Sequence, residues 1–448
     1  MTARGQRATV AARAGAPDLA GTWKRNLAFI WIGVFVGLLG AGFVFPFMPF
    51  YISKLGVSDT GKVATYAGLS EGATGLSLTL TAPIWGAMAD QFGRKPMFLR
   101  ALVGAGLLIG LMGIVQAVWQ LVLLRFLMGA FAGTMGAAAA LVAATTPREK
   151  VGRALGTLQT AAFSANMLGP VVGGVVAAKL GIRESFVFCA ALYLLAALLA
   201  YVFVREPGGV LAEGPRPGNP ARGGIVQDLR TVVSERQIVL MLGLMFVLWL
   251  GTTFVRPVMP LNIEHLSSTP NADSGEVALL LPGRTVHLDI EAATGIVFGI
   301  IGLTSTIAAL TVAPLGERLG YRRCVAGAAL LTGVLYVPVA VAGSFNAFLL
   351  MMGAVGLFQG AMVPGLNALI AASVPDGKQG SAFGLAASMQ SLALLCGPLG
   401  GGLTSQLLGI HGPYVVIGVV LAATGVMAYL FIREASLVGP RAHAVALE

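Results

Sequence analysis

The chain has 448 residues, of which 56% are hydrophobic and only 11% charged, and its mean hydropathy is +0.83. These values exclude a set of soluble domains and indicate a membrane protein. The formal net charge of +10 does not require a nucleic-acid partner, because basic residues collect where a membrane protein meets anionic lipids. The three cysteines are isolated from one another, so neither a disulfide framework nor a metal site is expected.

Twelve apolar stretches, separated by short polar segments, are long enough to cross a bilayer as helices of about 20 residues. The residues before the first stretch carry Lys and Arg but no cleavage site, so the first helix is retained. Lys and Arg are concentrated in alternate connections, and the positive-inside rule then places both termini in the cytoplasm. The predicted helices span residues 27–52, 63–89, 97–117, 119–145, 154–178, 185–204, 238–263, 292–316, 324–344, 346–372, 381–407 and 412–432.

Several phrases of the sequence occur twice at nearly constant spacing. The pairs are "FVFPFMP" (43–49) with "FVRPVMP" (254–260), 211 residues apart, "ADQFGRKP" (89–96) with "GERLGYRR" (316–323), 227 apart, and "GPVVGG" (169–174) with "GPLGGG" (397–402), 228 apart. Matches at one spacing indicate an internal repeat. The fold class predicted is therefore an all-α membrane protein whose twelve transmembrane helices form two pseudo-symmetric six-helix bundles.

The repeat also divides the chain. We predict a cytoplasmic N-terminal tail (1–25), an N-terminal bundle (26–204), a Gly- and Pro-rich cytoplasmic linker (205–237), a C-terminal bundle (238–433) with an extracellular insertion (264–291), and a cytoplasmic C-terminal tail (434–448). The insertion is inferred because the spacing between repeated phrases grows from 211 residues for the first pair to 227 for the second. Its alternating "TVHLDI" indicates a short hairpin, with an irregular insertion as the open alternative. Prolines should bend helices 1 and 7 at the repeated phrase.

The phrase "GAMADQFGRKP" closes the second helix. Gly86 and Gly93 allow close approach of another helix, Asp90 accepts hydrogen bonds, and Arg94 and Lys95 reach lipid headgroups. The phrase resembles the loop motif between helices 2 and 3 of the major facilitator superfamily. In that family the aspartate latches against the start of helix 11 and holds the outward-facing state. The resemblance implies this latch role for Asp90, with a topology anchor as the alternative.

The second copy of this loop retains Glu317 and Gly320 at the corresponding positions. It departs from the family pattern at Tyr321, where Arg is usual. The latch is therefore less well supported in the C-terminal bundle.

Arg125 lies about 30 Å from the inner end of its predicted helix, by a rise of about 1.5 Å per residue, and Glu71 lies at nearly the same height on helix 2. A charge inside a membrane helix should face protein or water and have a partner, so we predict that the two side chains pair. The position of Arg125 resembles the helix-4 motif of the same superfamily, which implies a proton-coupling role for the pair. Contact of Glu71 with outer water alone remains an alternative.

"GTLQTAAFSANMLGPVVGG" in the fifth predicted helix has a small-residue face and a proline that bends the helix, so two backbones can lie close together. It resembles the "antiporter" motif of drug-efflux members, with Ala165 where Gly is usual. That resemblance points to export. The motif residues are Gly156, Gly169, Pro170, Gly173 and Gly174.

In this fold the cavity is lined mainly by helices 1, 4, 7 and 10, whose aromatic and Met side chains suit apolar ligands. Arg256 either extends to the membrane interface or borders the outer mouth of the cavity. Most aromatic residues of these helices are nevertheless expected in packing or against lipid. The candidate cavity residues are Phe43, Phe45, Phe47, Met128, Phe246, Trp249, Arg256 and Gln359.

Over its whole length the chain resembles bacterial twelve-helix multidrug efflux transporters of the drug:proton antiporter branch. This resemblance implies export of lipophilic or amphipathic small molecules by proton antiport across the bacterial inner membrane, with protons and membrane lipids as further partners and a monomeric state. A proton-linked or facilitative importer of a sugar or other metabolite is the alternative. We expect no enzyme and no cofactor, because no nucleophile lies beside a base and no phosphate-binding loop is present.

Overall fold

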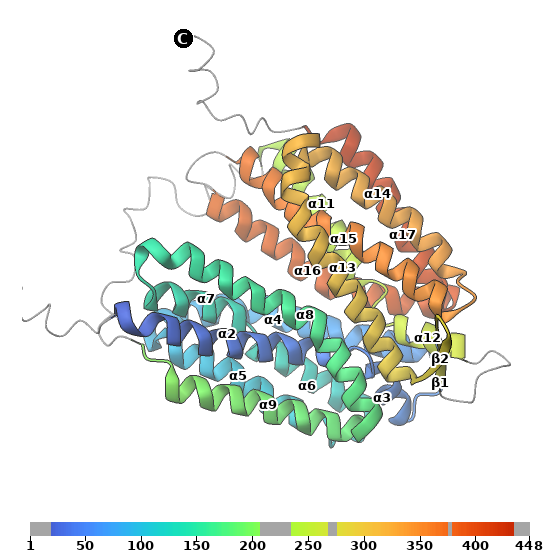
Figure 1. Ribbon diagram of the computed structural model, residues 1–448, viewed down its shortest axis with the longest axis horizontal. Helices are drawn as coiled ribbons and strands as arrows, with labels where there is room; N and C mark the ends of the chain where they lie inside the picture. Colours follow the sequence, from blue (N-terminus) through green and yellow to red (C-terminus); the bar gives the residue numbers. More distant parts are fainter. Residues whose placement is uncertain (1–18, 207–233, 268–275, 375–378, 434–448) are drawn as a thin grey trace, which may run out of the picture.

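The computed structural model describes residues 19–206, 234–267, 276–374 and 379–433 (Figure 1). Most of the predicted N-terminal tail and linker, and all of the predicted C-terminal tail, lie outside these residues. The described chain is almost entirely helical, with one two-stranded sheet.

The first bundle is formed by the helices from α2 to α9. These are α2 (Leu19–Phe43), α3 (Met48–Lys54), α4 (Thr60–Phe92), α5 (Arg94–Met112), α6 (Val118–Phe131), α7 (Thr134–Thr145), α8 (Val151–Leu180) and α9 (Ile182–Phe203). The second bundle repeats the arrangement. Its helices are α11 (Arg236–Thr253), α12 (Met259–Ser267), α13 (Ile290–Leu319), α14 (Tyr321–Ala340), α15 (Phe345–Ser373), α16 (Gln379–Leu408) and α17 (Gly412–Phe431).

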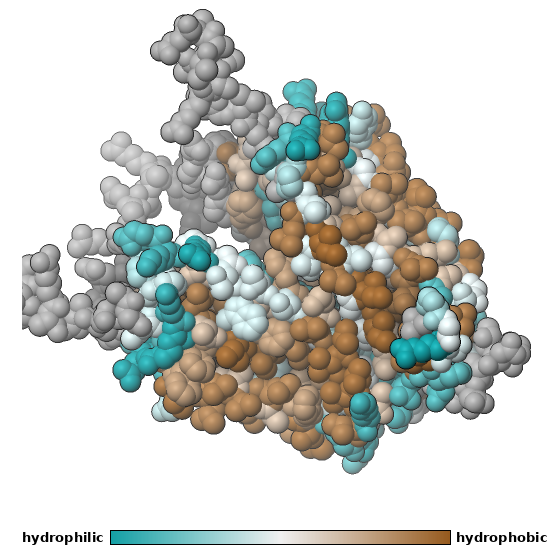
Figure 2. Space-filling model, in the orientation of Figure 1, coloured by the Kyte–Doolittle hydropathy of each residue, from teal (hydrophilic) through white to brown (hydrophobic). Residues whose placement is uncertain are grey.

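Among the described residues, eleven segments are long and apolar enough to cross a membrane, and the broken pair α6 and α7 forms one of them. The twelfth membrane helix is α4, which has 33 residues but a lower hydropathy because it carries Glu71 and many Gly, Ser and Thr residues. Large apolar side chains on the flanks face outward; Leu310, Leu350 and Leu407 expose 71%, 75% and 81% of their surface. Figure 2 shows this apolar surface on the flanks and hydrophilic side chains at the ends. The predicted twelve-helix fold is confirmed.

Three membrane helices of the described chain are interrupted. Helix 1 breaks between Phe43 at the end of α2 and Met48 at the start of α3. Helix 7 breaks between Thr253 at the end of α11 and Met259 at the start of α12, so the repeated proline phrase bends the chain in both bundles as predicted. Helix 4, which we predicted as continuous over 119–145, also breaks, at Gly133. Gly133 adopts a φ of 103°, a left-handed conformation that glycine tolerates without a Cβ clash.

The two bundles converge at one end of the molecule and diverge at the other (Figure 1). We call the first the hairpin end, because the two strands lie there, and the second the termini end, because α2 begins and α17 finishes there. At the hairpin end, a Cβ at Gly174 of α8 would overlap the backbone of Glu291 on α13, and one at Gly402 of α16 would overlap that of Ala64 on α4. Gly174 and Gly402 are 228 residues apart, so the repeat relates the two contacts between the bundles.

The insertion between helices 7 and 8 contains a hairpin. Strand β1 (Glu276–Leu281) pairs antiparallel with β2 (Arg284–Asp289), and Gly283 in the turn has a φ of 83°. Asn346 at the start of α15 accepts a hydrogen bond from the backbone N–H of Leu280 at 3.0 Å and donates one to its carbonyl at 2.7 Å. Of the two alternatives left open by the sequence, the hairpin is present, and it is attached to the C-terminal bundle.

Candidate functional site

Glu71 lies on α4 where this helix meets both α6 and the opposite bundle. Gly68, Gly72 and Gly75, close to it along the helix, form the face that packs on the backbone of α16. Thr74, three residues further along, donates a hydrogen bond to the carbonyl of Arg125 on α6 at 3.0 Å. Glu71 is 6% exposed, and its Oε2 has no hydrogen-bond partner among the described residues.

Arg125 is also buried. Its side chain is 3% exposed, and Nε and Nη2 have no hydrogen-bond partner in the described part of the chain. Its guanidinium and the Glu71 carboxylate interact electrostatically, and the Thr74 hydrogen bond places the two residues at one level, as the helical rise predicts. No ion pair closer than 4.0 Å joins them in the described residues, so direct pairing is not formed in this conformation.

Arg256 occupies the break between α11 and α12. Its guanidinium lies 5.1 Å from the centre of the Phe45 ring, and that ring lies 6.1 Å from Phe298 of α13. Arg256 also interacts electrostatically with Glu71. The guanidinium therefore points into the protein, and the interpretation that Arg256 extends to the membrane interface is wrong.

Phe45 and Arg256 are the equivalent positions of "FVFPFMP" and "FVRPVMP", 211 residues apart. The two copies of the phrase thus meet. Arg256, which stands where the first copy has Phe45, forms a cation–π contact with that Phe45 across the two bundles. Sequence reasoning found the repeat and the exchange, but it did not predict this contact.

The site combines one carboxylate with two guanidiniums, one from each bundle. Charges buried without hydrogen-bond partners are costly, so groups of this kind in membrane helices mark a pathway for an ion, a proton or a substrate. Because Glu71 and Arg125 belong to one bundle and Arg256 to the other, relative movement of the bundles changes the charge around Glu71. The arrangement can couple a protonation equilibrium to a conformational change.

The predicted cavity residues fall into two groups. Phe43 and Phe47 are fully buried and pack against Phe188 and Phe186 of α9 with ring centres 6.2 Å and 5.5 Å apart, so they are core residues of the N-terminal bundle here, not cavity lining. Met128 is likewise buried, at 5% exposure.

Within the C-terminal bundle, Gln359 donates hydrogen bonds to the Gly251 carbonyl and to the Tyr336 hydroxyl oxygen, both at 3.3 Å. It links α15 to the end of α11 and is 9% exposed. Phe246 and Trp249 on α11 are half-buried, and Trp249 Nε1 has no hydrogen-bond partner in the described residues. These two side chains, unlike Phe43 and Phe47, retain surface that a substrate could contact.

The loop after α4 is organised by a residue that sequence reasoning missed. The Glu206 carboxylate, just after α9, accepts hydrogen bonds from the backbone N–H groups of Arg94 and Lys95, both at 3.0 Å. Gly93 precedes them with a φ of 96°, and a Cβ there would lie 3.2 Å from Glu206 Oε2. An acidic residue at a helix N-terminus satisfies free N–H groups and complements the helix dipole. The only sequence signal for this cap was an acidic residue just after α9, the sixth membrane helix.

The other predicted latch residues lie apart from the charged site. The side chain of Asp90 and the surroundings of Gly86 lie outside the described residues. Gly320 repeats the conformation of Gly93, with a φ of 90°, and Glu317 is exposed. The latch between Asp90 and helix 11 therefore stays a prediction.

The antiporter motif places α8 between α2 and α13. A Cβ at Gly169 would lie 2.8 Å from the Leu39 carbonyl, and one at Gly173 would overlap the Phe43 carbonyl. On the opposite side, the Pro170 carbonyl lies 2.6 Å from where a Cβ of Gly295 would stand. Gly156, by contrast, has open space around it. The motif thus forms close backbone contacts within the first bundle and between the bundles.

Two six-helix bundles in contact at one end, with buried charges at their junction, define a membrane transporter of the alternating-access type. Residues 30–283 and 272–445 match the Major Facilitator Superfamily, and the chain belongs to this family. The multidrug resistance protein MdtG of Enterobacter lignolyticus is 30% identical over 414 residues, which cover 92% of this chain and 93% of that protein. The multi-drug resistance efflux pump PmrA of Streptococcus pneumoniae is 31% identical over 401 residues, covering 89% and 94%.

Solved structures show the same fold at low sequence identity. A POT family transporter in complex with 5-aminolevulinic acid superposes with a TM-score of 0.73 at 12% identity, covering 91% of this chain and 96% of that one. A D-xylose-proton symporter superposes with a TM-score of 0.67 at 15% identity, covering 92% and 97%. The chain is therefore a multi-pass membrane protein with a transporter fold.

Proposed function

We propose that this protein exports lipophilic or amphipathic small molecules across a bacterial inner membrane in exchange for protons, with Glu71 as the proton carrier. The relatives named multidrug resistance proteins support the export of varied compounds. The resemblance of α8 to the antiporter motif supports the same direction. The observation that carries the coupling is the buried Glu71 carboxylate, which interacts with guanidiniums of both bundles.

The structure, which is closed at the hairpin end, corresponds to the state that receives substrate from the termini end. Burial favours the neutral form of a carboxyl group and nearby positive charge favours its ionised form, so Arg125 and Arg256 act against the effect of burial on Glu71 in this state. When the hairpin end opens, Arg256 moves with the C-terminal bundle and the Phe45 contact is lost. The carboxyl group then regains a proton from the outer solution, and the bound substrate leaves on the same side.

The test is transport into inverted membrane vesicles, which place the cytoplasmic face outward. We expect pH-gradient-driven accumulation of a lipophilic cation such as ethidium by the wild type, and its loss in Glu71→Gln to the level measured with a protonophore. Glu149→Gln, which changes an exposed carboxylate at the termini end, is the matched control and should transport normally.

Exchange of labelled for unlabelled ethidium without a pH gradient should continue in Glu71→Gln, because this exchange requires alternating access but no proton. Accumulation that survives both the protonophore and the substitution would contradict proton coupling and support facilitated transport. Accumulation in the opposite direction would support the importer.

A further inference from the structure

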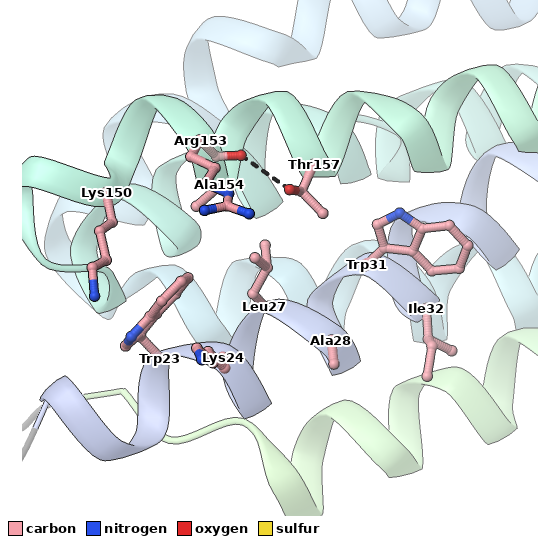
Figure 3. A pocket seen from close by; sticks show the side chains of 10 residues that line it. All are labelled: Trp23, Lys24, Leu27, Ala28, Trp31, Ile32, Lys150, Arg153, Ala154 and Thr157. Atoms are coloured by element: carbon pink, nitrogen blue, oxygen red, sulfur yellow. Dashed lines mark hydrogen bonds between the residues drawn. The ribbon is translucent and has the colours of Figure 1, made fainter.

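A cavity of about 670 Å³ lies between the termini-end segments of α2 and α8, apart from the charged site described above. Figure 3 shows Lys150 and Arg153 projecting toward α2, and Trp23, Leu27 and Trp31 projecting from α2 toward α8. Ten residues line the cavity, and all belong to the N-terminal bundle. They are Trp23, Lys24, Leu27, Ala28, Trp31, Ile32, Lys150, Arg153, Ala154 and Thr157.

The charge of this pocket has one sign. Lys24, Lys150 and Arg153 line it, and none of the ten described lining residues is acidic. The ammonium groups of Lys24 and Lys150 lie 5.9 Å and 5.4 Å from the Trp23 ring centre, so the indole brings two cations together. No ion pair closer than 4.0 Å involves these cations in the described residues. The described lining of the pocket therefore carries three basic side chains and no acidic one.

The opposite end of the pocket is apolar. Trp31 lies seven residues beyond Lys24 on α2, about 10 Å further into the membrane by helical rise. Its indole N–H donates a hydrogen bond to the Thr160 hydroxyl at 2.9 Å, which fixes the ring beside Leu27. Basic side chains at the surface and a fixed aromatic ring below them match a molecule with an anionic head and an apolar body.

We propose that this pocket binds an amphipathic anion, with the anionic group at Lys24, Lys150 and Arg153 and the apolar body against Leu27 and Trp31. Two sources have this chemistry: an anionic phospholipid of the adjacent leaflet and a free amphipathic anion such as a fatty acid. Neither the exchange of a proton at Glu71 nor the direction of transport enters the proposal.

The test uses bromine atoms, which quench tryptophan fluorescence on contact. Purified protein in phosphatidylcholine vesicles is titrated separately with brominated phosphatidylglycerol, with dibromostearate, and with brominated phosphatidylcholine. We expect at least one of the two anions to quench at about tenfold lower mole fraction than brominated phosphatidylcholine. Preference for phosphatidylglycerol identifies a lipid, preference for dibromostearate identifies a free anion, and equal preference shows that the pocket takes both.

The preference should disappear in the triple variant Lys24→Gln, Lys150→Gln, Arg153→Gln. It should persist in the matched triple variant Lys54→Gln, Lys62→Gln, Lys179→Gln, which removes three exposed lysines at the hairpin end. The single variant Arg153→Gln, which leaves the Trp23 contacts in place, should weaken the preference partially, and Trp31→Phe should reduce the part of the quenching that shows the preference. Equal quenching by all three probes, or an unchanged preference in the pocket triple variant, would overturn the proposal.

Discussion

At the scale of single residues, the contact between Phe45 and Arg256 joins the two bundles at the hairpin end. Cation–π contacts contribute about 0.5–1 kcal/mol at exposed sites and about 2 kcal/mol when desolvated. An energy of this size shifts a two-state equilibrium several-fold, so the contact can bias the closed hairpin end without locking it. Arg256 also interacts electrostatically with Glu71, so one side chain takes part both in the contact between the bundles and in the charged site.

We predict that Phe45→Leu shifts the population toward states open at the hairpin end by about twofold to fivefold, the equivalent of 0.5–1 kcal/mol. Spin-label distances across this end, measured in nanodiscs, report the populations. Arg256→Gln should cause a shift at least as large, because it also removes the electrostatic interaction with Glu71.

The double variant separates the contact from other effects of each substitution. If the Phe45 ring acts through Arg256, Phe45→Leu should add little in the Arg256→Gln background. Full additivity of the two shifts would show that the two residues act independently.

The prediction of these residues from sequence was uneven for a physical reason. Glu71 and Arg125 could be placed at one height because both belong to one bundle and helical rise fixes distance along the membrane normal. The partner of Arg256 could not be found in this way, since its contacts lie across the interface between bundles. Phe43 and Phe47 were assigned to the cavity because helix 1 was expected to line it, whereas both rings pack against aromatic rings of α9.

At the scale of elements, α8 and α16 are held against their neighbours by glycine. Gly173 faces the Phe43 carbonyl, and Gly401, 228 residues later, faces the Phe254 carbonyl in the equivalent place. These contacts are too close for a Cβ, and the neighbouring atoms belong to the backbone and cannot move aside cheaply. The glycines of the repeat therefore set the distance between α2 and α8, and between α11 and α16.

We predict that Gly173→Ala destabilises the protein by about 1–3 kcal/mol, the typical cost of overpacking, and reduces transport. Gly156→Ala, in the same helix and the same motif, should be neutral or slightly stabilising, because nothing lies within 4 Å of the new Cβ and Ala has the higher helix propensity. Thermal unfolding in detergent measures both. Equal melting temperatures for the two variants would contradict the assigned packing role.

A second element-scale prediction concerns the start of α5. Glu206→Ala removes the carboxylate that accepts the Arg94 and Lys95 N–H groups, and we expect a loss of about 1 kcal/mol in local stability. Hydrogen exchange of these amides should become faster, while exchange in the middle of α5 is unchanged. Glu235→Ala, which removes an exposed acidic side chain without a capping hydrogen bond at the start of α11, is the control. Unchanged exchange at Arg94 and Lys95 would show that the carboxylate has no capping role.

The helices could be predicted because length and hydropathy identify a membrane helix in a sequence. The breaks in helices 1 and 7 followed from their prolines, but the break in helix 4 did not, since a glycine inside a membrane helix is also compatible with straight packing. The cap by Glu206 depends on where the chain after α9 runs, which local sequence does not determine.

At the scale of the whole molecule, the two bundles and their pseudo-symmetry followed directly from the repeats in the sequence. The conformational state did not, because a transporter sequence encodes both states. The structure shows one: the bundles meet at the hairpin end through α4 with α16 and α8 with α13, and they diverge toward the termini end (Figure 1). Alternating access requires the other, in which these glycine-lined contacts open.

The proposed exchange requires substrate binding and protonation of Glu71 to exclude each other. The most direct measurement is proton release on substrate binding, followed with a pH indicator in a weakly buffered detergent solution of the purified protein. We predict that ethidium releases protons from the wild type and from Glu149→Gln, but not from Glu71→Gln. Release of the same size from Glu71→Gln, or none from a wild type that binds ethidium, would contradict it.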